Sequence, residues 1–100
     1  MASADERAHG ETFVLERGGK AIDFTTVLLG FASSALIHMG VQPHPDSGAV
    51  NKDAALAREV LDLLALLREK TRGNLTVEED RFFDSLLTDL RLKFVEAFPR

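Results

Sequence analysis

"FTTVLLGFASSALIHMGV", residues 24–41, contains no Asp, Glu, Lys or Arg, although these residues make up 28% of the chain. At 18 residues the run reaches only the lower limit for a membrane span. Four hydroxyl groups, Gly30 and His38 reduce its hydrophobicity further. We therefore interpret it as a buried helix rather than as a transmembrane segment.

The bulk composition indicates one small domain. The chain has 100 residues, a net charge of -4 and no cysteine, so we expect one core without disulfides or thiolate metal sites. The negative charge disfavours nucleic-acid binding, which requires a positive field. Acidic and basic side chains are mixed before the apolar run begins, unlike in a secretory signal. We expect a cytoplasmic protein that binds no nucleic acid and does not span a membrane.

Local signals place two helices in the first three quarters of the chain. Asp23 is a suitable N-cap for a helix over residues 24–39, and Gly40 marks its end. The following stretch, VQPHPDSGAVN, contains two prolines and a glycine and is predicted to be a loop. Asn51 is expected to cap a second helix, which ends at Gly73. Its apolar seam, with spacings of four, three and four, consists of Leu56, Val60, Leu63 and Leu67.

A third helix has the clearest start signal. Thr76, with Glu79 three residues later, forms a capping-box pattern, and the acidic first turn suits the positive end of the helix dipole. Pro99 marks the end of this helix. The apolar stripe is Phe83, Leu87, Leu90 and Phe94, flanked by Phe82, Leu86, Val95 and Phe98.

These signals predict an all-α fold, with a single three-helix domain over residues 22–98. Residues 1–21 contain few large apolar side chains and end in RGGK, which predicts a flexible N-terminal arm. Within this arm, ETFVLE (residues 11–16) is a candidate for a short extended piece docked on the domain.

The helices carry wider apolar arcs than two neighbours in a small bundle would cover. Gly30 and Ser34 lie one turn apart on the first helix and allow another backbone to approach closely. We therefore expect a homodimeric helical bundle, intertwined or side by side, with the first helix at its centre. The candidate interface comprises Phe24, Leu28, Gly30, Phe31, Ser34 and Ala35.

No motif has the pattern of a catalytic or metal site. His38 and His44, with Asp46 nearby, match no ligand spacing, and GGK lacks the flanking residues of a phosphate-binding loop. We expect no enzymatic activity, no metal and no cofactor. A basic patch at the end of the second helix is either a solvated helix end or a surface for an acidic partner. The candidate partner surface comprises Arg68, Lys70, Arg72 and Phe98.

Three segments carry a resemblance to a known family: ASSALIHMG, EKTRGNLT and LLTDLRLKFVE. Over roughly residues 22–96 the chain resembles short bacterial proteins grouped as a domain of unknown function. The resemblance implies a small, helical, cytoplasmic protein, and no functional residue carries over. One branch of the family is similar to RomX-type polarity proteins. These act with the response regulator RomR to promote nucleotide exchange on the Ras-like GTPase MglA.

Two classes of function remain open. The first is a dimeric protein–protein interaction module, which by the resemblance acts on a small GTPase together with a response-regulator protein. The second is a small-ligand-binding protein with an apolar, Phe-lined cavity between its helices. Polar groups are scarce within the apolar faces, and ligand sites normally need some, which favours the first class.

Overall fold

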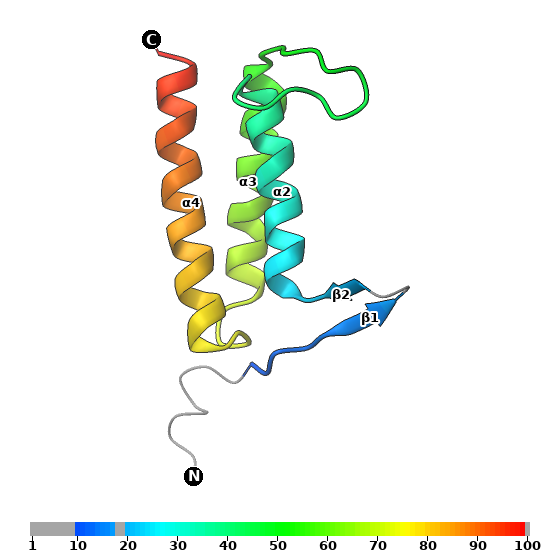
Figure 1. Cartoon of the computed structure of the whole chain (residues 1–100). Coiled ribbons are helices and arrows are strands. Elements are labelled where there is room, and N and C mark those ends of the chain that lie inside the picture. The colour runs from blue at the N-terminus through cyan, green and yellow to red at the C-terminus, as the bar shows by residue number, and fades with distance from the viewer. Residues whose placement is uncertain (1–9, 18–19, 100) are drawn as a thin grey trace.

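A short β-hairpin followed by three helices makes up the fold (Figure 1). The computed structural model describes residues 10–17 and 20–99. The elements are β1 (Leu15–Arg17), β2 (Lys20–Ile22), α2 (Phe24–His38), α3 (Ala54–Lys70) and α4 (Val77–Ala97). Helix α3 runs antiparallel to α2 and α4, and each helix packs against the other two. The predicted all-α, three-helix domain is confirmed, with the hairpin added to it.

The starts of α2 and α4 follow from side chains that accept backbone N–H groups. The Asp23 carboxylate accepts a hydrogen bond from the Thr26 amide at 2.9 Å, as predicted. At α4 the Glu79 amide donates to Thr76 Oγ1 at 3.1 Å, and the Thr76 amide donates to Glu79 Oε1 at 3.0 Å. The predicted capping box is therefore confirmed.

Helix α3 starts later than predicted. Asp53, not Asn51, is its N-cap and accepts the Leu56 amide at 3.0 Å. The Asp53 amide in turn donates to the carbonyl of His38, the last residue of α2, at 2.8 Å. Because this bond satisfies a carbonyl that has no partner within α2, it holds the chain at Asp53 and sets the start of α3 there.

Glycines in left-handed conformation follow the first two helices. Gly40 has a φ of 77° and comes directly after the C-cap of α2, as the sequence predicts. Gly73 has a φ of 76°, but α3 already ends at Lys70. A turn therefore separates this helix end from the glycine that was expected to mark it.

The core lies between the three helices. On α4 the predicted stripe is confirmed, because Phe83, Leu87 and Leu90 are buried and Phe94 is half-buried, although the flanking Val95 is exposed. On α3 the buried face is rotated from the predicted seam, of which Leu56 and Leu63 are 41% and 44% exposed. Ala57 and Leu64 on the rotated face are fully buried. The buried residues of α3 are Ala57, Val60, Leu61, Leu64 and Arg68.

The segment before α2, which lies largely within the predicted flexible arm, contains a short hairpin. β1 and β2 pair antiparallel, with Leu15 opposite Ile22. The strand residues of the predicted arm therefore have a paired backbone, and Leu15 and Ile22 form an apolar pair across it. ETFVLE contributes to β1, in agreement with its prediction as an extended piece. Residues 1–9 and 18–19, also assigned to the arm, lie outside the described residues.

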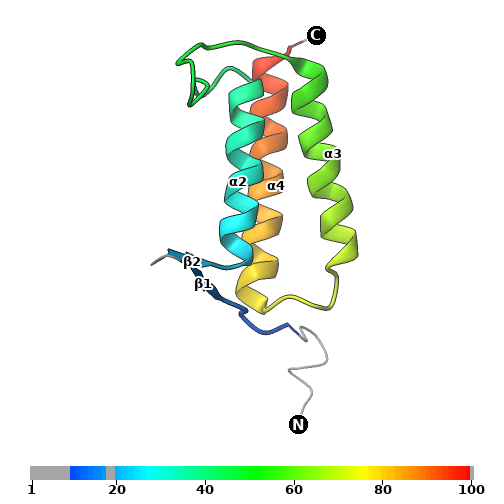
Figure 2. The ribbon, with the colours of Figure 1, turned by 90° about the vertical axis from the view of Figure 1, so that its right-hand side faces the viewer.

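The hairpin and the α2–α3 loop both project from the same side of the bundle, at opposite ends of α2 (Figure 1). Figure 2 views this side directly and shows α2 in front of α4 between the two projections. The radius of gyration is accordingly 15.6 Å, compared with about 13 Å for a compact chain of this length. Among the described residues, no helix is long and apolar enough to cross a membrane; α2 has only 15 residues.

Candidate functional site

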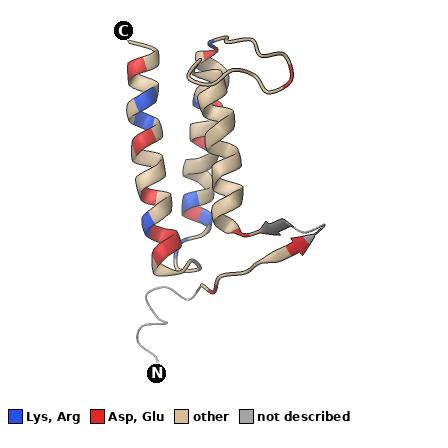
Figure 3. Cartoon of the chain, viewed as in Figure 1, with Lys and Arg blue, Asp and Glu red and all other residues tan. Residues whose placement is uncertain are grey.

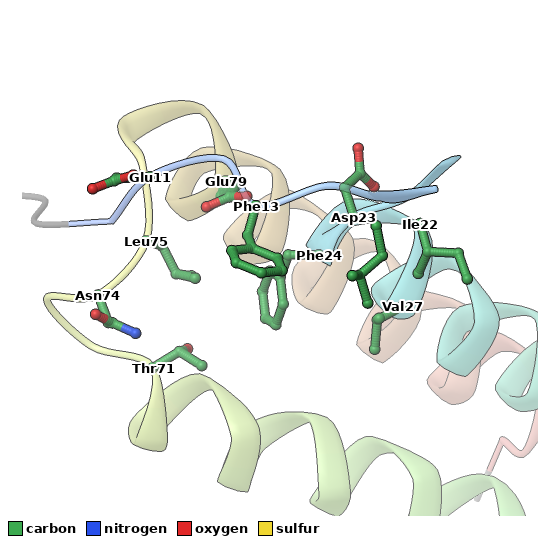
Figure 4. Close-up of a pocket in the computed structure, with 11 residues that line it drawn as sticks. Glu11, Phe13, Ile22, Asp23, Phe24, Val27, Thr71, Asn74, Leu75 and Glu79 are labelled. Atoms are coloured by element: carbon green, nitrogen blue, oxygen red, sulfur yellow. The ribbon is translucent and has the colours of Figure 1, made fainter. Parts of the chain in front are cut away.

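A surface recess with a mostly apolar lining lies at the end of the bundle where the hairpin meets the helices (Figure 4). We call it the hairpin groove. It has a volume of about 320 Å³ and is formed by the hairpin, the start of α2, the α3–α4 turn and the first turn of α4. Its lining residues are Glu11, Phe13, Leu15, Ile22, Asp23, Phe24, Val27, Thr71, Asn74, Leu75 and Glu79.

Rigid elements position the apolar part of the hairpin groove. Phe24 packs on Phe83 of α4 with ring centroids 5.9 Å apart, and Leu75 is only 4% exposed. In contrast, Phe13 is 72% exposed, and its side chain points into the same space as those of Phe24 and Leu75 (Figure 4). The groove is therefore a fixed apolar floor bordered by apolar side chains that remain open to solvent.

A close backbone contact holds the N-terminal wall of the hairpin groove. Gly10 lies directly against the backbone of Asn74 and Leu75 in the α3–α4 turn. A Cβ atom at Gly10 would collide with the Asn74 carbonyl oxygen and with Leu75 Cα. Only glycine permits this approach, so the residue fixes where the segment leading to Phe13 crosses the end of the bundle.

The polar groups of the hairpin groove are largely engaged within the chain. Asp23 accepts hydrogen bonds from the Thr26 amide and hydroxyl, at 2.9 and 2.8 Å, which lowers the pKa of its carboxyl. Glu79 is 7% exposed and holds the capping box. The Thr71 hydroxyl donates to the Leu67 carbonyl at 2.9 Å. None of the residues described as lining the groove is Lys or Arg. It thus combines an apolar interior with an acidic rim.

The predicted dimer interface divides into buried and accessible residues. Leu28 and Ala35 are 0% exposed and lie in the core of their own chain, so their side chains have no surface to offer to a second folded copy. Phe24 lines the hairpin groove, whereas Gly30, Phe31 and Ser34 lie with Val27 around a shallow depression on α2. Of the six residues predicted to form the interface, four therefore remain accessible: Phe24, Gly30, Phe31 and Ser34.

The accessible side of α2 carries no charge along its length (Figure 3). We call the residues at its centre the α2 face, and their three- and four-residue spacings place them on one side of the helix. An added Cβ at Gly30 would meet nothing within 4 Å, which shows how open this face is. The α2 face comprises Thr26, Val27, Gly30, Ser34 and Ile37.

The predicted partner surface contains one residue that the structure places in the interior. Arg68 is 9% exposed, and its Nε lies 2.9 Å from Asp84 Oδ1 while its Nη1 lies 3.1 Å from Asp80 Oδ1. Its guanidinium also covers the Phe83 ring, 5.5 Å from the centroid. Hydrogen bonding to Asp84 raises the pKa of Arg68, and Arg68 lowers the pKa of Asp84. Arg68 therefore joins α3 to α4 and is a structural residue, which corrects its assignment to a partner surface.

The other three residues of the predicted partner surface do not form one patch. Lys70 is the exposed last residue of α3, and Arg72 is exposed two residues later and pairs with Glu69 at 2.8 Å. Phe98 lies at the opposite end of α4, stacked against Phe94 with centroids 5.0 Å apart. The 21-residue length of α4 separates the basic residues from Phe98, so no single partner contact spans them.

Sequence reasoning missed most of the hairpin groove. The sequence feature that indicates the groove is the spacing of Phe13 and Leu15 in ETFVLE. Two residues apart on a strand, they place two apolar side chains on one face. Of the two histidines considered above, His44 has a local role, because its Nδ1 accepts the Asp46 amide at 3.2 Å within the loop. In the described part of the chain no three His, Cys, Asp or Glu residues are grouped to hold a metal ion.

Comparison with known proteins gives one match. The family model called Domain of unknown function (DUF1844) covers residues 21–96. The chain belongs to this family. No curated protein and no solved structure matches the chain. The DUF1844 match covers α2, α3 and all but the last residue of α4, together with the groove-lining residues from Ile22 to Glu79, whereas Phe13 and Leu15 precede it.

Proposed function

We propose that this DUF1844 protein is a non-catalytic interaction module whose hairpin groove receives an apolar segment of a partner protein. One observation carries the proposal: large apolar side chains stay exposed around a groove that rigid elements hold in place. Such patches on small proteins commonly mark interaction sites. Their exposed fractions are 72% for Phe13, 54% for Leu15, 40% for Ile22 and 41% for Val27.

The engagement of the polar groups favours a protein over a small molecule as the occupant. Small-ligand sites orient their ligand with a few free polar groups inside an enclosing cavity. Here Asp23, Glu79 and Thr71 already bond to backbone groups, and the aromatic ring of Phe13 is open to water. A Phe-lined small-ligand site stays the alternative, because Phe13 and Phe24 do line the groove.

The acidic rim indicates the charge of the partner segment. Glu11, Asp23 and Glu79 are the ionisable residues that line the hairpin groove. An apolar segment flanked by Lys or Arg would place positive charge against them, whereas an acidic segment would meet like charges. We therefore propose an apolar partner segment with basic flanks.

The class of partner comes from the resemblance to RomX-type polarity proteins. On that basis we propose a cytoplasmic regulator that acts with a RomR-type response regulator to promote nucleotide exchange on an MglA-type GTPase. The support is membership of the DUF1844 family, one branch of which is similar to RomX-type proteins, together with a groove suited to a protein segment. We further propose that the module is a homodimer, because the α2 face leaves uncharged, partly apolar surface in water.

Release of a fluorescent GDP analogue from the GTPase of the same cell, with and without the response regulator, tests this proposal. We expect the DUF1844 protein to accelerate release. Phe13→Ser should weaken partner binding about 30-fold, as for an aromatic anchor of about 2 kcal/mol. Val95→Ser is the matched control, because Val95 is 64% exposed on α4, away from the groove. Equal effects of both variants, or no binding to either partner, would contradict the proposal.

A further inference from the structure

We propose that a second copy of the chain docks on the α2 face, with the two α2 helices crossing antiparallel about a two-fold axis near Gly30. This inference rests on the homodimer part of the proposed function and not on the GTPase or the response regulator.

The charge distribution favours a second copy as the occupant. A two-fold interface brings the same surface of each protomer together, so every charge near the axis meets its own like. The outer surface of α4 carries Glu78, Arg81 and Asp89 among other charges, whereas α2 has none along its whole length. Of the three helices, only α2 can therefore be placed against its own copy without like charges in contact.

The position of Gly30 fits such an axis. It lies next to the midpoint of α2, so a two-fold axis there overlaps the full length of both helices. Nothing lies within 4 Å of where its Cβ would be, and the two backbones can approach closely at this point. The residues that flank it on the α2 face, Val27 and Ser34, are short side chains that do not block the approach.

The ends of α2 decide between a parallel and an antiparallel arrangement. The hairpin projects beside one end of α2 and the α2–α3 loop beside the other, on the same side of the bundle (Figure 1). A parallel pair would bring exposed Glu11 and Glu16 of the two copies to one end. An antiparallel pair instead brings the hairpin of each copy to the loop of the other, where Val41 and Val50 are 53% and 61% exposed. It also opposes the two helix dipoles.

The size of the contact requires both projections. A 15-residue helix is about 22 Å long and 10 Å wide, so its face alone covers on the order of 200 Å². A stable interface buries about 800 Å² on each partner. The hairpin and the loop must therefore contribute most of the area, and the exposed Val41 and Val50 of the loop become buried in the dimer.

Sedimentation equilibrium and single-cysteine cross-linking test the inference on the intact chain, which has no natural cysteine. Wild type should have a mass of about 22 kDa at tens of micromolar, twice the 11.0 kDa of one chain. Gly30→Cys should form a disulfide-linked dimer on mild oxidation. Ser85→Cys, at an exposed position on α4, is the matched control and should stay unlinked.

Two further variants test the direction of the helices. In an antiparallel pair Thr26 of one copy faces the region of Ser34 of the other. Thr26→Cys and Ser34→Cys should each link poorly alone and link readily when mixed. Ready self-linking of Thr26→Cys would show a parallel pair and overturn the inference, while the homodimer itself would stand. A mass of 11 kDa at all concentrations up to about 100 μM would overturn both, and the groove would still be tested by Phe13→Ser.

Discussion

Helices α2 and α4 pack against the same core but present different surfaces to solvent. The inward side of α4 is a narrow apolar stripe, and its outer side is charged from the first turn onward. The inward side of α2 contributes Leu28, Ala32 and Ala35 to the core, and its outer side is uncharged. The charged side chains on the outer side of α4 are well solvated, whereas exposure of the apolar side chains on the outer side of α2 to water costs free energy. Two helices that bury side chains in the same core can therefore differ in how favourably water solvates their outer sides.

This difference separates two kinds of information in an apolar helix. Periodicity tells which side of a helix faces its own core. The composition of the remaining side tells whether that side faces water or another protein. For α4 both signals agree with a helix at the surface of a monomer. For α2 only the first signal is satisfied inside one chain, because its outer side is uncharged and remains open to water.

The largest effect is expected from the shared core. Leu28→Ala should lower the free energy of unfolding by about 3 kcal/mol, since it removes a fully buried side chain and leaves a cavity. Leu92→Ala on α4 is the matched control, because Leu92 is 58% exposed, and it should cost well under 1 kcal/mol. Urea denaturation followed by circular dichroism measures both. Similar losses would mean that α2 is not seated in the core as described.

The next largest difference in stability is expected between substitutions of Arg68 and of Arg72, near the end of α3. Arg68→Ala should cost about 2 kcal/mol, because it leaves the partly buried Asp80 without its cation and uncovers the Phe83 ring. Arg72→Ala should leave the melting temperature nearly unchanged, because its pair with Glu69 is exposed on both sides. Thermal unfolding of the two variants gives the comparison. A larger loss for Arg72→Ala would contradict the assignment of Arg68 as the link between α3 and α4.

Removal of the capping box should have an intermediate effect on α4. Thr76→Ala should lower stability by about 1 kcal/mol, because the Glu79 amide loses its acceptor at the start of the helix. Thr88→Ala, at an exposed position in the middle of α4, should change stability by only a few tenths of a kcal/mol. Amide hydrogen exchange in the first turn of α4 should rise in the first variant alone. An unchanged melting temperature for Thr76→Ala would contradict the described start of the helix.

The sequence was sufficient to predict the parts of the fold that local rules control. The caps at Asp23 and Thr76 and the buried stripe of α4 depend on residues within a few positions of each other, so they can be recognised from spacing. The start of α3 was misplaced by two residues because Asn51 and Asp53 are both good caps. A hydrogen bond from Asp53 to the end of α2 decided between them, and spacing carries no information about that contact.

The candidate site was harder to predict because it joins segments distant in the sequence. Phe13 reaches the α3–α4 turn only because Gly10 packs against Asn74 and Leu75, a contact across more than sixty positions. Arg68 was expected on a basic surface because three positive residues are close in sequence. Acidic residues on α4 draw it inward instead, and a basic patch on one helix gives no sign of such a partner.

The smallest effect bears most directly on the contrast between α2 and α4. Gly30→Ala should stabilise an isolated chain by about 0.5–1 kcal/mol, because glycine is costly inside a helix and the new methyl group has free space. The same methyl group should weaken the dimer, because it separates two backbones that approach closely at Gly30. Denaturation at low concentration measures the first effect, and the dimer dissociation constant from sedimentation measures the second. Ser85→Ala on α4 should leave dissociation unchanged. If Gly30→Ala raises stability and leaves dissociation equally unchanged, the open side of α2 does not cross its own copy at Gly30.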